Sequence, residues 1–280
     1  MNYCKKCVLP ESRPNLFILP DGICTACHSH QGKKNIDWVE KEKKFRKLIK
    51  KIKDKKLLYD CLIPVSGGKD STWQVLLAKK YKLNPLAFTY KPVLRTKIGQ
   101  DNIDNLKKIG IHHIEFSVNE SVEKKFLKKA FIKNGAIAIP MHLAMWSMSY
   151  NLAQKFSIPY IFWGENSARE YGGSKQDKKM NNLDDKWIKK YGINFGKKAE
   201  DWVDSDLSQQ DLAPFIKNIK NKKNIPISLF MGDFFNWDPQ KTFHHAKKFG
   251  FRNYKKKTKT GYYNYADIDD DLISIHHYLK

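Results

Sequence analysis

Short apolar runs alternate with longer segments of helical periodicity through the middle of the chain. The apolar runs predict β-strands over residues 58–65, 85–90, 111–118 and 159–163. The segments between and beside them place apolar residues on one helical face and predict helices over residues 70–81, 100–109, 122–133 and 141–156. Strands that alternate with helices build a parallel sheet, because each crossover returns along the face of the sheet. The pattern therefore predicts a doubly wound α/β domain over residues 57–200.

Two further segments flank this domain. Residues 36–56 place apolar side chains such as Phe45 and Ile52 at helical spacing among lysines. We interpret this segment as an amphipathic helix that docks a narrow apolar stripe on the domain, in preference to a helix that binds nucleic acid. Residues 201–280 contain one more apolar run, IPISLFMGDFF, and an aromatic tail that begins GYYNYADIDDDL. We expect this last region to contact a substrate or a partner.

Composition and charge narrow the class of protein. The chain of 280 residues is 41% hydrophobic, so it can bury a substantial core. Its formal net charge of +23 comes almost entirely from lysine, whereas base and phosphate recognition favours the guanidinium fork of arginine. We therefore interpret the charge as a solvated lysine-rich surface and do not expect nucleic acid as a partner. The N-terminus is too polar for a secretory signal, and the longest apolar run, residues 135–150, is too short to span a bilayer. We expect a cytoplasmic protein without a membrane span.

The cysteines indicate a metal site near the N-terminus. Two CxxC pairs contain Cys4, Cys7, Cys24 and Cys27. Two such knuckles complete a closed tetrahedral site, so we expect a structural Zn²⁺ that holds together a module of residues 1–35. A redox role is the alternative, but redox CxxC motifs normally begin a helix within a βαβ unit. The fifth cysteine, Cys61, lies in a predicted strand and is expected to be a core thiol.

A polar string follows the first predicted strand. It reads SGGKDS and consists of Ser66, Gly67, Gly68, Lys69, Asp70 and Ser71. The two glycines let backbone amides approach an anion, the hydroxyls add donors and the lysine neutralises charge. The aspartate is suited either to orienting Mg²⁺ or to capping the helix. The spacing differs from that of the common mononucleotide loop, and a simple glycine turn would not explain the whole string. The sequence thus predicts a phosphate-binding loop at the carboxyl edge of the sheet.

This string resembles the signature of the PP-loop ATP pyrophosphatases. The resemblance implies a sheet of the HUP type and cleavage of ATP between the α and β phosphates. Enzymes of that superfamily adenylate a carbonyl-type oxygen, release pyrophosphate and let a nitrogen or sulfur nucleophile displace AMP. They include amide-forming synthetases, tRNA-modifying enzymes and sugar amidotransferases, and the loop alone does not distinguish among them.

Four longer stretches resemble one group within the superfamily, the N-acetyl sugar amidotransferases. They are YCKKCVLPESRPNLFILPDGICTAC, IFWGENSAREYGG, MGDFFNWD and GYYNYADID, and together they extend over nearly the whole chain. The resemblance implies conversion of a sugar acetamido group into an acetamidino group for surface polysaccharide, either lipopolysaccharide O-antigen or nonulosonic acid. The alternative is a tRNA-thiolating PP-loop enzyme, which would also explain the basic charge. Such an enzyme needs a sulfur-relay cysteine apart from the metal site, and only Cys61 is left over.

The resemblance also assigns candidate roles. Lys69, Asp70 and Glu165 are the expected catalytic residues, with Glu165 as the base for attacking ammonia. Glu165 and Asn166 follow the strand that ends at residue 163, which places them at the same sheet edge as the loop. Thr89, at the end of the second strand, is the further expected ATP contact. The expected substrate contacts are Asn166, Arg169, Tyr171, Gly172, Gly173 and Asp233. A cap or turn is the alternative for the residues after 163, and for Asp233 and Asp238.

The source of ammonia is expected to lie outside this chain. No cysteine stands at position 2, and four of the five cysteines are assigned to metal, so no glutaminase nucleophile is available. The resemblance implies a separate glutaminase with a cyclase-like partner subunit, and the lysine-rich surface would be suited to that docking. In the family the aromatic tail continues into a further segment, so the region of residues 201–280 is expected to be truncated, divided between two genes or shortened relative to the family.

Overall fold

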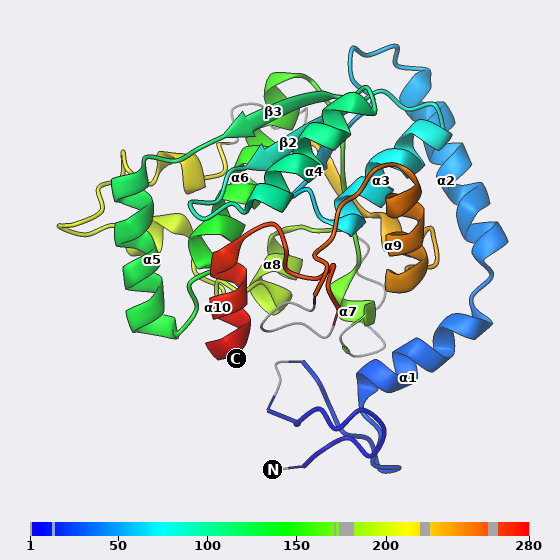
Figure 1. Cartoon of the computed structure of the whole chain (residues 1–280), viewed down its shortest axis with the longest axis horizontal. Coiled ribbons are helices and arrows are strands. Elements are labelled where there is room, and N and C mark those ends of the chain that lie inside the picture. The colour runs from blue at the N-terminus through cyan, green and yellow to red at the C-terminus, as the bar shows by residue number, and fades with distance from the viewer. Residues whose placement is uncertain are drawn as a thin grey trace.

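Five parallel strands form the centre of the molecule (Figure 1). The computed structural model describes residues 2–12, 15–170, 172–173, 182–218, 225–256 and 263–279. The strands lie in the order β3-β2-β1-β4-β5. Their bounds are Cys61–Pro64 (β1), Pro85–Tyr90 (β2), His112–Phe116 (β3), Tyr160–Trp163 (β4) and Ile227–Phe230 (β5). The predicted α/β fold with a parallel sheet is confirmed, and the four strands expected from the apolar runs are all present.

Helices cover both faces of the sheet. The crossover helices are α3 (Lys69–Lys80), α4 (Lys97–Lys108), α5 (Glu120–Asn134) and α6 (Ile139–Lys155). The side chains of α3 and α4 belong to one hydrophobic core, and those of α5 and α6 belong to another. Successive strand residues point to opposite faces, and β1 follows this rule. Cys61 and Ile63 pack with α3 and α4, whereas Leu62 packs on the side of α5 and α6. The sheet is therefore doubly wound.

The amphipathic segment before the domain forms α2 (Trp38–Lys53), which runs along the right-hand edge of Figure 1. Asp37 caps it by accepting a hydrogen bond from the backbone N–H of Glu40 at 2.9 Å. Its apolar stripe is fully buried at Phe45 and Ile52, and the Phe45 ring contacts the rings of Tyr81, Phe162, Phe234 and Phe235. Burial of each of these two side chains contributes about 1.5–3 kcal/mol. The expected docking on the domain is confirmed.

The C-terminal region contributes to the sheet instead of standing apart from it. β5 pairs with β4 in parallel, from Tyr160 opposite Ile227 to Trp163 opposite Phe230. The sheet thus extends beyond the boundary that we expected at residue 200, because the apolar run at 225–235 finds its hydrogen-bond partners on β4. The helix α8 (Asp185–Tyr191) precedes β5 in the chain, and the helices α9 (Pro239–Lys248) and α10 (Asp271–Leu279) follow it. α9 packs against α3.

The N-terminal module lies at the bottom of Figure 1 and contacts the domain through its helix α1 (Thr25–Gly32). α1 contacts the short helix α7 (Ser167–Glu170) that follows β4. Asn15 Nδ2 also donates to the carbonyl oxygen of Lys190 at 3.0 Å. The remaining short elements are the 3₁₀ helices at Lys33–Asn35, Ala199–Trp202, Ala213–Phe215 and Met231–Asp233. Every helix in the described part of the chain is too short or too polar to cross a membrane.

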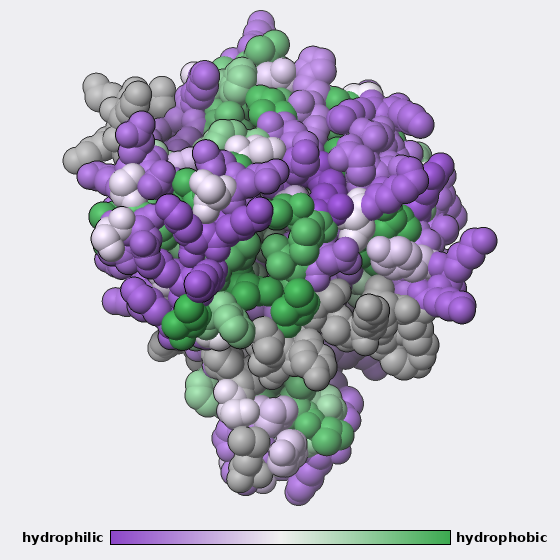
Figure 2. Space-filling view, turned by 60° about the vertical axis from the view of Figure 1, so that its left-hand side comes forward, coloured by the Kyte–Doolittle hydropathy of each residue, from purple (hydrophilic) through white to green (hydrophobic). Residues whose placement is uncertain are grey.

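Hydrophilic side chains cover most of the face shown in Figure 2. A hydrophobic hollow lies at the centre of this face, above the lobe formed by the N-terminal module. Many lysines, which give the chain its net charge of +23, are exposed.

Candidate functional site: the carboxyl edge of the sheet

The SGGKDS string forms the turn between β1 and α3, as predicted. Gly67 has a φ of +87°, and a side chain on it would meet the carbonyl oxygen of Gly99 at 2.9 Å. Gly68 is the N-cap of α3, and its backbone N–H donates to Ser66 Oγ at 3.2 Å. Ser71 Oγ donates back to the carbonyl oxygen of Gly68 at 3.1 Å. These bonds hold the loop closed around a bare stretch of backbone at a helix N-terminus, which is a favourable place for an anion.

The charged residues of the string lie in the first turn of α3. Lys69 Nζ pairs with Asp70 Oδ2 at 2.5 Å, and the Lys69 side chain is only 12% exposed. Asp70 Oδ1 is buried and has no hydrogen-bond partner among the described residues. A carboxylate oxygen of this kind is a suitable ligand for Mg²⁺. The loop therefore presents a cation and an unused carboxylate oxygen beside its backbone amides.

Glu165 faces this loop from the end of the neighbouring strand. The strand order reverses between β1 and β4, and the crevice at such a reversal is where open α/β sheets bind ligands. Burial, together with the negative charge of Asp70, raises the pKa of Glu165 to about 7, and the positive charge of Lys69 opposes this rise. The structure thus brings Glu165 into the electrostatic neighbourhood of two loop residues that are far from it in sequence. A carboxyl group with this pKa can exchange a proton near neutral pH.

Asn166, Arg169 and Asp233 form a buried cluster behind Glu165. Arg169 Nε lies 2.7 Å from Asp233 Oδ1, and Asn166 Nδ2 donates to the same oxygen at 3.5 Å. Burial raises the pKa of Asp233 to about 6, against the opposing charge of Arg169. The backbone N–H of Gly232 donates to the carbonyl oxygen of Gly164 at 3.1 Å. These contacts join the loops after β4 and β5 into one wall of the site.

The remaining predicted residues lie in different settings. The Thr89 hydroxyl is buried and bonds to the carbonyl oxygen of Val65 at 2.7 Å and to His113 Nε2 at 2.8 Å, so its assignment as an ATP contact stays a prediction. Gly172 and Gly173 are buried, and a side chain on Gly172 would meet Thr25 Oγ1 of the N-terminal module at 2.9 Å. Tyr171 lies outside the described residues. Asp238 is the N-cap of α9, and its side chain accepts hydrogen bonds from the backbone N–H groups of Gln240 and Lys241. This agrees with the alternative interpretation of Asp238 as a capping residue.

The structure adds residues that the sequence reasoning did not single out. They belong to residues 263–269, the described part of the GYYNYADID stretch. Lys69 Nζ lies 5.7 Å from the centre of the Tyr265 ring. The Ser66 hydroxyl hydrogen-bonds to Asp269, whose pKa is nevertheless raised by burial. The backbone of Asp269 also packs on Gly99 in the first turn of α4. The available signal was the dense mixture of aromatic and acidic residues in that stretch.

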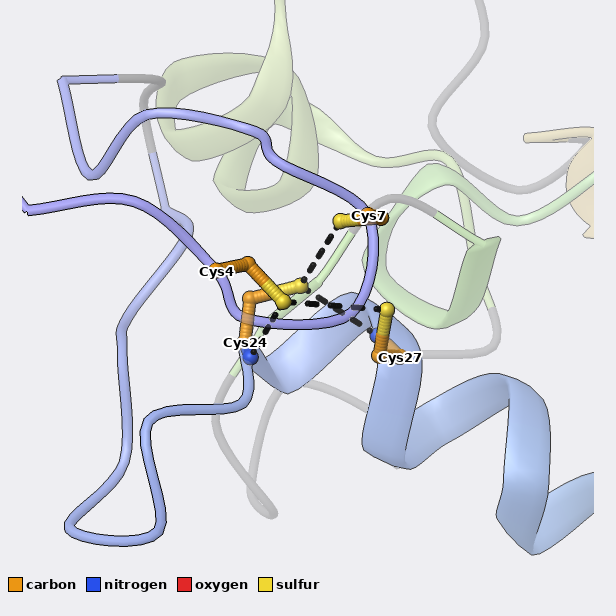
Figure 3. A group of neighbouring side chains, drawn as sticks. All are labelled: Cys4, Cys7, Cys24 and Cys27. Atoms are coloured by element: carbon orange, nitrogen blue, oxygen red, sulfur yellow. Dashed lines mark hydrogen bonds between the residues drawn. The ribbon is translucent and has the colours of Figure 1, made fainter.

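The four N-terminal cysteines converge as expected (Figure 3). Their sulfur atoms all lie within 4.8 Å of one another, with 3.6 Å between Cys7 and Cys24 and 4.0 Å between Cys4 and Cys27. Tetrahedral zinc with bonds of about 2.3 Å would separate its sulfur ligands by about 3.8 Å. Burial and the three neighbouring thiols raise the pKa of Cys27 to about 12, so four thiolates need a cation among them. The donor set fits Zn²⁺ in a closed structural site.

Backbone amides support the same interpretation. The N–H groups of Lys6 and Cys24 point at Cys4 Sγ from 3.4 and 3.2 Å, and the N–H of Cys27 points at Cys24 Sγ from 3.4 Å. Such bonds stabilise the thiolate form that binds metal. Cys61 is fully buried in β1, and burial raises the pKa of its thiol. It is a core thiol, as expected.

No family model matches the chain. No curated protein matches it. Among solved structures, an NMN synthetase from Francisella tularensis has a TM-score of 0.37 at 18% identity, over 48% of this chain and 56% of that one. An NH3-dependent NAD synthetase from Campylobacter jejuni has a TM-score of 0.36 at 18% identity, over 49% of this chain and 62% of that one. The likeness thus covers less than two thirds of either synthetase.

A third structure is similar over more of its length. A predicted subunit of tRNA methyltransferase from Methanocaldococcus jannaschii has a TM-score of 0.35 at 17% identity, over 67% of this chain and 75% of that one. The fold assignment rests on the strand order and the loop geometry of this chain.

Proposed function

We propose that this chain is an ATP-dependent amidotransferase of the PP-loop type that converts the acetamido group of an N-acetyl sugar into an acetamidino group. The observation that carries the proposal is the SGGKDS loop at the β1–α3 turn, with Glu165 facing it from the end of β4. The four stretches that resemble sugar amidotransferases support the choice of substrate, and surface polysaccharide is the proposed destination of the product.

The proposed chemistry has two steps. In the first, the acetamide oxygen attacks the α-phosphorus of ATP and pyrophosphate leaves, which makes AMP a good leaving group on the former amide carbon. The loop amides and Lys69 would stabilise the charge that develops on the phosphates. Asp70, whose Oδ1 has no hydrogen-bond partner among the described residues, is the carboxylate proposed to hold Mg²⁺, which when bound would neutralise phosphate charge.

In the second step, ammonia attacks the activated carbon and AMP departs. The attacking nitrogen must lose a proton, and a carboxylate with a pKa of about 7 is suited to accept it. Glu165 is the proposed base. Ammonia is proposed to come from a glutaminase with a cyclase-like partner subunit, or from free ammonium in the assay.

The test is product analysis with purified protein, ATP, Mg²⁺ and ¹⁵N-ammonium. A nucleotide-linked N-acetyl sugar should stimulate release of AMP and pyrophosphate in equal amounts, and ¹⁵N should appear in an amidine product. Ser66→Ala and Asp70→Ala should abolish the release while the protein keeps its cooperative unfolding transition. Release stimulated by tRNA and not by the sugar would instead identify the alternative, a tRNA-modifying enzyme.

A further inference from the structure

A cavity of about 240 Å³ lies where the N-terminal module meets the loops after β4 and β5. The module and the segment after it contribute Gly32, Lys33 and Trp38, and the domain contributes Arg169, Glu170 and Gly232. The typical pocket for a drug-sized ligand is about 300–1,000 Å³. This cavity is therefore of a size for one monosaccharide and a phosphate group, and not for a whole nucleotide.

The polar groups of the cavity are held in place by contacts across the junction. Lys33 Nζ lies 2.6 Å from Glu170 Oε2 and donates to the carbonyl oxygen of Trp237 at 3.0 Å. The side chains of Lys33 and Glu170 are 14% and 16% exposed. Trp38 Nε1 donates to the carbonyl oxygen of Lys33 at 3.2 Å, which fixes the orientation of the indole ring. A partly buried aromatic ring with a fixed orientation is a suitable surface for a sugar.

The charge of the cavity favours an anionic ligand. Lys33 and Arg169 are cations that line it, and Glu170 is an anion. Lys41 lies near enough for Arg169 to lower its pKa, an effect second to that of burial. Lys33 is paired with Glu170, and Arg169 is paired with Asp233. Lys41 adds a third cation to these two pairs, and a phosphate group would interact favourably with this excess of positive charge.

The cavity adjoins the proposed reaction centre. Gly232 lines it, and a side chain on Gly232 would lie 3.4 Å from Glu165 Cα and 3.5 Å from Asn166 N. The pKa of Glu165 responds to Asp70 and Lys69 of the loop and also to Glu170 of the cavity wall. Glu165 thus lies between the SGGKDS loop and the cavity.

We propose that this cavity binds the sugar and the attached phosphate of the acceptor, with Trp38 beneath the sugar ring and Lys33 and Arg169 facing the phosphate. The proposal rests on the function proposed above and adds a role for the zinc module, which builds one wall of the acceptor site. An acetamido group on the bound sugar would then point toward Glu165, which lies between the cavity and the SGGKDS loop.

Binding measurements test this proposal without any need for turnover. The probes are UDP-N-acetylglucosamine, N-acetylglucosamine 1-phosphate and free N-acetylglucosamine, titrated calorimetrically into the full chain. Trp38→Leu and Lys33→Gln should each weaken binding of the two phosphorylated probes by at least about tenfold, and free N-acetylglucosamine should bind much more weakly than either. The matched controls are Val39→Leu and Lys34→Gln, at neighbouring exposed positions outside the cavity, and they should bind as the unmodified protein does.

Zinc content and thermal unfolding of every variant verify that the module is intact. If the Trp38 and Lys33 variants retain zinc and bind the phosphorylated probes as tightly as their controls, the cavity is not the acceptor site. Failure of the unmodified protein to bind either phosphorylated probe would also overturn the proposal. Binding that depends on Trp38 and Lys33 without any amidine product would support the cavity and refute the chemistry. Amidine formation with an unchanged acceptor KM in both variants would support the chemistry and refute the assignment of the cavity as the acceptor site.

Discussion

Replacement of Gly67 by alanine tests whether the fold depends on the backbone path of the phosphate loop. Gly67 has a φ of +87°, and a residue with a side chain loses about 1–2 kcal/mol in the left-handed region. The new methyl group would also lie 2.9 Å from Gly99 O and 3.2 Å from Ile103 Cγ1. Overpacking of this kind costs about 1–3 kcal/mol. The expected loss is therefore about 2–5 kcal/mol of the free energy of unfolding.

Gly99 has no room to move away from this contact. A side chain on Gly99 would meet the backbone of Asp269 at 2.7 Å, so the first turn of α4 lies close between the loop and the C-terminal stretch. The matched variant is Gly68→Ala. Gly68 has an ordinary φ of −72°, and among the described residues a side chain on it would contact only Ser66 Oγ, at 3.2 Å.

Urea denaturation followed by circular dichroism measures both variants against the unmodified protein. Gly67→Ala should show the full loss, whereas Gly68→Ala should lose little stability and instead weaken ATP binding through the displaced Ser66 hydroxyl. Equal stability of the two variants would refute the reasoning, because it would mean that neither the backbone angle nor the contact with Gly99 constrains the loop.

Three further predictions follow from the site, the metal centre and the core. The acceptor-dependent kcat/KM should rise with pH through about 7 as Glu165 loses its proton, and Glu165→Gln should remove this rise. Burial disfavours the carboxylate in the folded state, so the free energy of unfolding should fall between pH 4.5 and about 7, and it should fall less in Glu165→Gln than in the unmodified protein. Mass spectrometry of the intact protein should find one zinc ion per chain, lost in Cys24→Ser and kept in Cys61→Ser. Asp60 is 3% exposed and accepts hydrogen bonds from Lys53 Nζ and from the backbone N–H of Asn84, both at 2.6 Å. Asp60→Ala should therefore lower the free energy of unfolding, measured by urea denaturation, by about 1–3 kcal/mol. A loss no larger than that caused by replacing an exposed aspartate would contradict this prediction.

Local patterns in the sequence were sufficient for most of the sheet. β2 begins and ends at the predicted residues, because an apolar run that is buried on both faces has a clear signal at both ends. The first strand is shorter than predicted: β1 begins at Cys61, and Leu58 before it is 71% exposed. The predicted strand began too early because Leu58 is apolar, whereas backbone pairing with β2 begins only at Cys61.

The sequence by itself determined the features whose cause is local. The alternation of apolar and polar positions predicted the strands and helices, the spacing of the CxxC pairs predicted a set of four sulfur ligands, and SGGKDS after a strand predicted a loop at the carboxyl edge. In each case the structural feature depends on residues that are close together in the chain, or on a short motif, such as CxxC, that occurs twice.

Only the tertiary structure decided which distant segments meet at that loop. It placed β5 beside β4, so that Asp233 meets Arg169, and it laid the stretch with Tyr265 and Asp269 across Lys69 and Ser66. It also closed a cavity between the N-terminal module and α7. These contacts join residues far apart in the sequence, and their formation depends on how whole elements pack, which no local pattern in a single sequence specifies.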